Sequence, residues 1–61
     1  MRAVIQRYRI GGNEELWSGE VPVAPRIDES ICIDPDDASV IVERVDWDYS
    51  THPIQLCIIV H

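Results

Sequence analysis

The chain has 61 residues, of which 46% are hydrophobic, and its eleven acidic residues against five arginines give a formal net charge of -6. This length allows one domain, and the apolar content excludes a disordered chain, although folding can bury only about 60% of the surface that an unfolded chain of this size exposes. The negative charge disfavours nucleic-acid binding, because such binding relies on clustered positive charge.

The first elements predicted are two strands joined by a tight turn. Residues 3–10 alternate between two faces and are rich in branched and aromatic side chains, which favours a strand. Gly-Gly-Asn at residues 11–13 supplies residues that tolerate positive φ and favours a hairpin turn. A second strand is expected over residues 16–23, and Pro22, which has no amide proton, places that strand at a sheet edge.

A connector at residues 24–29 is expected to lead to a short third strand over residues 30–33. The Asp-Pro-Asp-Asp sequence at residues 34–37 matches a type I turn, with Asp at the first position and Pro fixing φ at the second. This turn is predicted to deliver the chain into the next strand.

Two apolar runs follow, at residues 38–47 and 54–60, separated by a loop that contains Pro53. We expect them to form the longest antiparallel pair of the fold, because both runs are β-rich and the proline interrupts them. Their inward faces are predicted to supply most of the core. The expected buried positions are Val40, Val42, Leu56 and Ile58. On the last strand, one face is expected to carry Ile54, Leu56, Ile58 and Val60.

No segment shows helical periodicity over the length of a stable helix. Five short strands separated by turns predict an all-β fold, a small five-stranded antiparallel meander closed into a barrel, as one domain over residues 1–61. Closure of the barrel would also remove exposed sheet edges.

The sequence PRIDESICI at residues 25–33, followed by VIVERVDW at residues 40–47 and a final apolar strand, resembles the small SH3-like β-barrel proteins of bacteria and phages. In that family Pro-Arg-x-Gly-Asp-x-Ile often precedes a long strand ending in Val-x-x-Val-x-Trp. This sequence has Asp28 and Glu29 in place of Gly-Asp. The resemblance covers residues 21–60 and implies a fold more than a function.

The beginning of the chain interrupts its apolar residues with arginines, unlike the apolar segment of a signal peptide, and the longest apolar run, residues 56–60, is far short of a membrane span. These features predict a cytoplasmic location. Cys32 and Cys57 are then expected to be free thiols that pack as small hydrophobic residues, the alternative being a disulfide that staples a small domain.

Spacing disfavours a metal site. Asp34 and Asp36 begin like a calcium loop, but valines occupy the downstream positions where ligands and a closing glutamate are needed. Cys57 and His61 are four residues apart on a strand, about 13 Å at roughly 3.3 Å per residue, which is too far for one zinc ion. No cofactor is expected. No nucleophile, base and orienting group stand in a hydrolase arrangement, so no catalytic residue is assigned and the chain is not expected to be an enzyme.

The aromatic residues are the best indication of a site. Tyr8 and Trp17 are predicted to help close the core. Another pair of aromatic residues flanks an aspartate near the end of the fourth strand, in an arrangement typical of an interface anchor surrounded by acids. The predicted partner-binding residues are Asp46, Trp47, Asp48 and Tyr49.

Three functional hypotheses follow. The first is a small acidic interaction module, encoded by a phage or mobile element, that binds a basic protein surface and inhibits a nucleic-acid enzyme by imitating the charge of phosphate. Under this hypothesis the acidity is functional, whereas it otherwise serves solubility alone. The second is a structural subunit that assembles as a homodimer or larger homo-oligomer through the last strand or the exposed side of the strand before it. The third, disfavoured by the net charge, is nucleic-acid binding through Arg2, Arg7 and Arg9.

Overall fold

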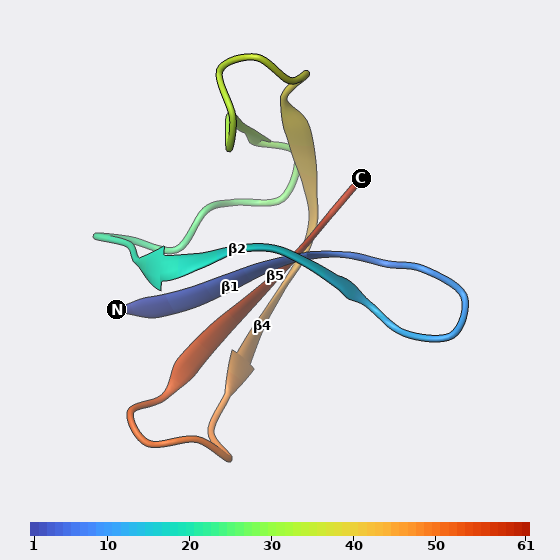
Figure 1. Cartoon of the computed structure of the whole chain (residues 1–61). Helices are drawn as coiled ribbons and strands as arrows, with labels where there is room; N and C mark the ends of the chain where they lie inside the picture. The colour runs from blue at the N-terminus through green and yellow to red at the C-terminus, as the bar shows by residue number, and fades with distance from the viewer.

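The computed structural model covers residues 1–61 and contains five strands and no helix (Figure 1). The strands are β1 (Arg2–Arg7), β2 (Glu14–Glu20), β3 (Ser30–Ile31), β4 (Val40–Asp48) and β5 (Gln55–Val60). They form one sheet in the order β2-β1-β5-β4-β3. The all-β class is therefore confirmed. Because the fold contains no helix, no helix of this structure could span a membrane.

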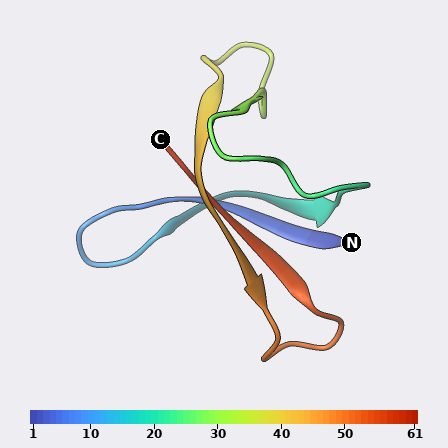
Figure 2. The same ribbon diagram turned by 180° about the vertical axis from the view of Figure 1, so that it is seen from behind.

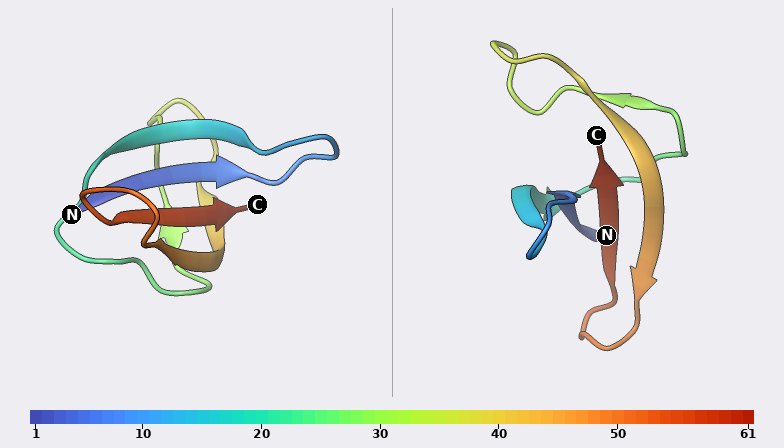
Figure 3. Two further views of the ribbon diagram at one scale, coloured as in Figure 1. Left: turned by 90° about the horizontal axis from the view of Figure 1, so that it is seen from below. Right: turned by 90° about the vertical axis from the view of Figure 1, so that its right-hand side faces the viewer.

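The centre of the sheet joins the two strands that are furthest apart in the sequence. β1 and β5 lie side by side and run parallel, from Arg2 opposite Gln55 to Arg7 opposite Val60 (Figures 1 and 3). All other strand pairs are antiparallel. The prediction of a wholly antiparallel sheet is wrong at this pair, because side-chain alternation tells which face of a strand is buried and not the direction of its neighbour.

The predicted antiparallel pairing of β4 with β5 is confirmed, and it runs from Val42 opposite Val60 to Asp48 opposite Gln55. β4 is the longest strand of the fold. The β1–β2 hairpin nevertheless pairs over a comparable length. The fold therefore has two long hairpins, and each supplies one strand of the central parallel pair.

The sheet curls strongly into a half-barrel, as the views in Figure 3 show. β2 and β3 stand at the two ends of the strand order, and no ladder joins them. The expected closure of the barrel is therefore not reached, because β3 is only two residues long and the chain between β2 and β3 crosses the opening as a loop (Figure 2). β2 is an edge strand, as Pro22 predicted, although the strand ends two residues before the proline.

One face of the sheet carries a small aliphatic core. The residues that pack together in it are Ala3, Ile5, Val40, Val42, Leu56, Ile58 and Val60. The four positions predicted to be buried are all confirmed. The loop between β2 and β3 covers this face with Val21 and Ala24, and the segment after it adds Ile31 and Ile33.

Three hydrophobic positions depart from the prediction. Ile54 precedes β5 and is 42% exposed, so it does not share the buried face of that strand. Tyr8 is 70% exposed because β1 ends at Arg7 and the tyrosine lies beyond the sheet. Trp17 lies on the edge strand and is 36% exposed. Aliphatic side chains fill the core, and neither aromatic residue closes it.

The turns follow their sequence signals closely. Gly11 and Gly12 both adopt positive φ, at 93° and 141°, in the hairpin between β1 and β2. In the Asp-Pro-Asp-Asp turn, the amide of Asp37 donates to the carbonyl of Asp34 at 3.0 Å, and the side chain of Asp34 accepts from the amide of Asp36 at 3.0 Å. A β-turn at this position is thus confirmed.

Asp28 adopts a left-handed backbone conformation that favours glycine. Its φ is 74°, and the amide of Glu29 donates to the carbonyl of Arg26 at 3.1 Å. The amide of Asp28 then donates to the carbonyl of Val42 at 2.8 Å, while the amide of Val42 donates to Glu29 at 2.9 Å. These bonds attach the connector to β4 beside the residue where the register with β5 shifts.

Both cysteines are free thiols, so the structure has no disulfide. Cys57 is half-buried in the central strand β5. Cys32 is exposed just after β3 and does not pack as a buried hydrophobic residue, contrary to the expectation for both thiols.

Candidate partner-binding groove

The face of the sheet that points away from the core carries a mixed set of side chains. Because Leu56 and Ile58 point into the core, their neighbours Cys57 and Ile59 point to the opposite face. The register sets Cys57 opposite Asp46 of β4. We call this side of the sheet the outer face.

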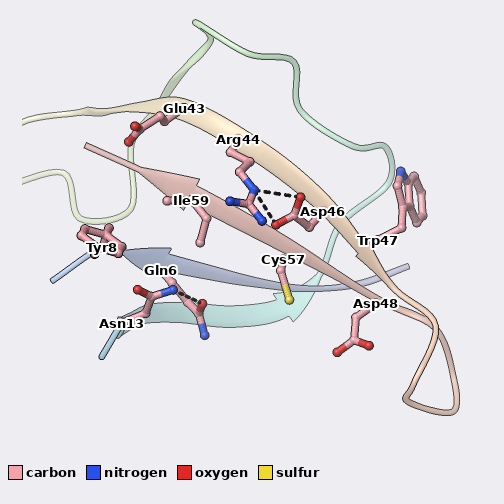
Figure 4. Close-up of a pocket in the computed structure, with 10 residues that line it drawn as sticks. All are labelled: Gln6, Tyr8, Asn13, Glu43, Arg44, Asp46, Trp47, Asp48, Cys57 and Ile59. Carbon is pink, nitrogen blue, oxygen red and sulfur yellow. Dashed lines mark hydrogen bonds and ion pairs between the residues drawn. The ribbon is translucent and has the colours of Figure 1, made fainter. Parts of the chain in front are cut away.

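A groove of about 750 Å³ runs over the outer face (Figure 4). Cys57 and Ile59 of β5 form its apolar floor. Tyr8 stands at one end of the groove in the close-up. Trp47 borders the other end, but it pairs with Leu56, so its ring lies on the core side of β4 and points away from Asp48. Its polar lining comes from β4 on one side and from the β1–β2 hairpin on the other, and consists of Glu43, Arg44, Asp46, Asp48, Gln6 and Asn13. Three segments distant in sequence therefore build one concave surface.

An ion pair occupies the β4 wall of the groove. Nε of Arg44 lies 2.8 Å from Oδ2 of Asp46 and donates to its Oδ1 at 3.0 Å. The hydrogen bond and the charge of Asp46 raise the pKa of Arg44, so the guanidinium remains protonated throughout the useful pH range. The two residues are two positions apart on β4 and therefore share one face of the strand. Their pairing neutralises Arg44, which is the only base in the groove.

On the opposite side, Nδ2 of Asn13 donates to Oε1 of Gln6 at 3.3 Å. This bond links β1 to the turn that follows it and fixes the two amide groups along that wall. The amide–amide wall is neutral, so the charge of the groove comes from β4.

Asp48 holds the loop that joins β4 to β5. Its Oδ1 accepts hydrogen bonds from the hydroxyl and from the amide of Ser50, the latter at 2.9 Å. The hydroxyl bond, followed by the amide bond, lowers the pKa of Asp48. The hydroxyl of Thr51 donates to the carbonyl of Pro53 at 3.1 Å within the same loop, which also contains the cis His52–Pro53 bond. Asp48 thus has a structural role that the sequence pattern did not predict.

The structure brings together three of the four predicted site residues. Asp46, Trp47 and Asp48 line the groove, and the indole of Trp47 is 51% exposed. Tyr49 lies outside the groove lining, where its ring is 72% exposed. Three of the predicted residues therefore border the groove and Tyr49 does not. The negative charge of the acids is reduced by the pairing of Arg44 with Asp46.

Sequence reasoning missed the part of the groove that β1, the first hairpin and β5 provide. Alternation along β5 already indicated that Cys57 and Ile59 share a face. No sequence signal placed Gln6 or Tyr8 beside them, because that proximity depends on the parallel pairing of β1 with β5.

The arginines near the beginning of the chain do not form one basic patch. Arg2 and Arg7 lie on opposite faces of β1, since they are an odd number of residues apart on one strand. Nε of Arg9 lies 2.6 Å from Oε2 of Glu14. No three His, Cys, Asp or Glu side chains converge closely enough to hold a metal ion.

No family model, curated protein or solved structure matches this chain. The groove itself is therefore the basis for a functional assignment.

Proposed function

We propose that this protein is an interaction module whose outer-face groove binds a positively charged segment of a partner protein. The observation that carries the proposal is the combination of an apolar floor, the exposed ring of Tyr8 at one end and carboxylates along one wall. Aromatic side chains supply most of the binding energy in many interfaces, and surrounding charges select the partner and speed its association.

The charge of the groove defines the chemistry of that partner. Glu43, Asp46 and Asp48 face one base, Arg44, which is already bound to Asp46. The whole chain carries a formal charge of -6. A segment rich in Lys or Arg would therefore be attracted at a distance, and on contact it would meet carboxylates of which only Asp46 is bound to an arginine.

A nucleic-acid enzyme is the class of partner that fits this charge best, because the surface on which such an enzyme binds phosphate is basic. A module bound there would inhibit the enzyme by occupying the phosphate-binding surface. This more specific proposal rests on the net charge and on the position of the acids.

A second candidate function is that of a structural subunit in a homo-oligomer. Both edges of β5 are covered, by β1 and β4, so assembly through the edges of the last strand is not available. Residues 44–48 of β4 have no strand on the side away from β5, and this free edge favours the candidate. Sedimentation at micromolar concentration separates the two functions, since a persistent monomer would exclude self-assembly.

Affinity capture tests the groove directly. The immobilised protein is exposed to a cell lysate at low and at high salt, beside Tyr8→Ala and, as a matched control outside the groove, Tyr49→Ala. We expect a basic protein that is retained at low salt and released at high salt, about tenfold less of it on Tyr8→Ala, and unchanged retention on Tyr49→Ala. Equal retention on wild type and Tyr8→Ala would exclude the groove as the binding site.

A further inference from the structure

The edge strand β2 has backbone groups without partners. Met1 and Val21 exchange two hydrogen bonds of 2.8 Å, one in each direction, and so form a hydrogen-bonded pair at the start of the β1–β2 ladder. Hydrogen-bonded and non-bonded pairs alternate in an antiparallel ladder. The backbone groups of Gly19 therefore face β1, while those of Ser18 and Glu20 point away from the sheet. No hydrogen bond outside the strand ladders reaches Ser18 or Glu20.

The side chains along this edge differ between its two faces. Glu15, Ser18 and Glu20 stand opposite outer-face residues of β1. Trp17 lies on the core side, and its ring extends along the strand over Gly19, since a Cβ built on that glycine would be 2.8 Å from Cζ2 of the indole. The edge thus offers carboxylates on one face and a partly exposed aromatic ring on the other.

We propose that the β2 edge binds an extended segment of a partner protein as an added strand, and that this segment alternates basic and apolar residues. The unpaired amide and carbonyl groups of Ser18 and Glu20 would bond to the backbone of the segment. Its basic residues would lie beside Glu15 and Glu20, and its apolar residues would pack on Trp17. The proposal does not rest on the proposed function of the groove, because none of these residues lines the groove.

Charge argues against a second copy of this chain as the added strand. β2 carries three glutamates and no base, so two β2 strands would set carboxylates beside carboxylates in any register. The other free edge, at residues 44–48, also carries more acids than bases. Glu20 is 3.3 Å from the amine of Met1, which shows that its carboxylate accepts a cation in this position.

A peptide of alternating Lys and Val is a suitable probe. Its binding to the ¹⁵N-labelled protein at low salt would be followed by NMR and amide hydrogen exchange. We expect chemical-shift changes centred on residues 15–20 and at least tenfold slower exchange of the Ser18 and Glu20 amides at saturation. The same peptide with N-methyl groups on alternate residues, on the side that faces β2, should bind at least tenfold more weakly because it cannot complete the ladder.

Ser18→Pro removes an outward amide that the sheet does not use, and proline is tolerated at such edge positions. We expect it to weaken peptide binding at least tenfold, while Ser18→Thr, which keeps the amide, and Tyr49→Ala, which lies outside both the groove and β2, bind as the wild type does. The proposal is overturned if the peptide does not bind at low salt, if shift changes are confined to the groove, or if Ser18→Pro binds with unchanged affinity. If Ser18→Pro fails to fold, equal binding of the two peptides by the wild type is the result that excludes an added strand.

Discussion

Asp28 is the one residue other than glycine with a positive φ, at 74°. A left-handed backbone costs a side chain about 1 to 2 kcal/mol, while glycine loses about 0.4 to 1 kcal/mol through the greater freedom of the unfolded chain. We therefore predict that Asp28→Gly stabilises the fold by roughly 0.5 to 1 kcal/mol in urea unfolding. Asp28→Ala, which cannot relieve the strain, should give no gain. A loss of stability in Asp28→Gly would mean that the aspartate side chain supports the turn.

Asp48 links the stability of the β4–β5 loop to pH. Because hydrogen bonds from Ser50 lower the pKa of Asp48 in the folded state, its contribution is fully present above the unfolded-state pKa of about 3.9. It is lost as the pH falls through the lower pKa of the folded state. We predict that Asp48→Ala melts below the wild type at neutral pH and that the difference vanishes under acid conditions.

A second variant isolates the cause of this pH dependence. Ser50→Ala removes the hydroxyl donor and leaves the amide bond in place, so it should lose part of the same stability within the same pH range. Thermal melts of the three proteins from pH 2 to pH 7 provide the measurement. A difference between wild type and Asp48→Ala that stays constant across this range would contradict the role assigned to Asp48.

Among the elements, β5 contributes most to the core, because both its neighbours are strands and its inward side chains are fully buried. Ile58 is 1% exposed. Ile58→Ala should destabilise the fold by about 2 to 5 kcal/mol, which is enough to unfold a domain of this size. Ile59→Ala is the matched control, with the same side chain on the half-buried outer face, and should cost clearly less. Equal melting temperatures for the two variants would show that the faces of β5 are misassigned.

The same strands show what a sequence of this kind reveals. The apolar runs at residues 40–42 and 56–60 predicted the core strands correctly, because strands at the centre of a fold are rich in branched apolar residues. Glycine and proline signals predicted the turns, because they act within four residues of the chain. The direction and partner of β1 were not predictable in this way, because they depend on contacts with a strand some fifty residues away.

The groove was predictable only in the part that one strand supplies. Asp46 to Asp48 are neighbours in sequence, and their mixture of acids and an aromatic residue indicated a surface for binding. The pairing of Arg44 with Asp46 depends on side-chain geometry, and the floor and far wall depend on sheet order. Sequence patterns contain little information on either.

Over the whole molecule, repulsion between acids opposes folding. Acids exceed bases by six, and the ion pairs of Arg9 and Arg44 are exposed, where such pairs contribute about 0 to 1 kcal/mol. Salt weakens both effects, but the repulsion involves more groups. We predict that 0.5 M sodium chloride raises the melting temperature by about 2 to 8 °C, which corresponds to roughly 0.5 to 1 kcal/mol at this size.

Glu15→Gln provides the control for this prediction. Glu15 takes part in none of the ion pairs, so its replacement reduces the negative net charge from -6 to about -5 without breaking one. The variant should gain stability at low salt and respond less to added salt than the wild type. A melting temperature that falls with salt in the wild type would show that ion pairs outweigh the repulsion.

The parallel pairing of β1 with β5 also governs how the chain reaches this fold. The β1–β2 and β3–β4 pairs meet only through β5, which lies between them in the sheet. Neither half can complete its side of the core until a loop of nearly the whole chain has closed, and the entropy of that closure must be lost before the buried contacts form. Folding should therefore be slow for a domain of this length, in the range of milliseconds to seconds that is typical of small β-proteins with high contact order. During synthesis, the β1–β2 and β3–β4 pairs would leave the ribosome before β5, and the shared core would form only when β5 follows.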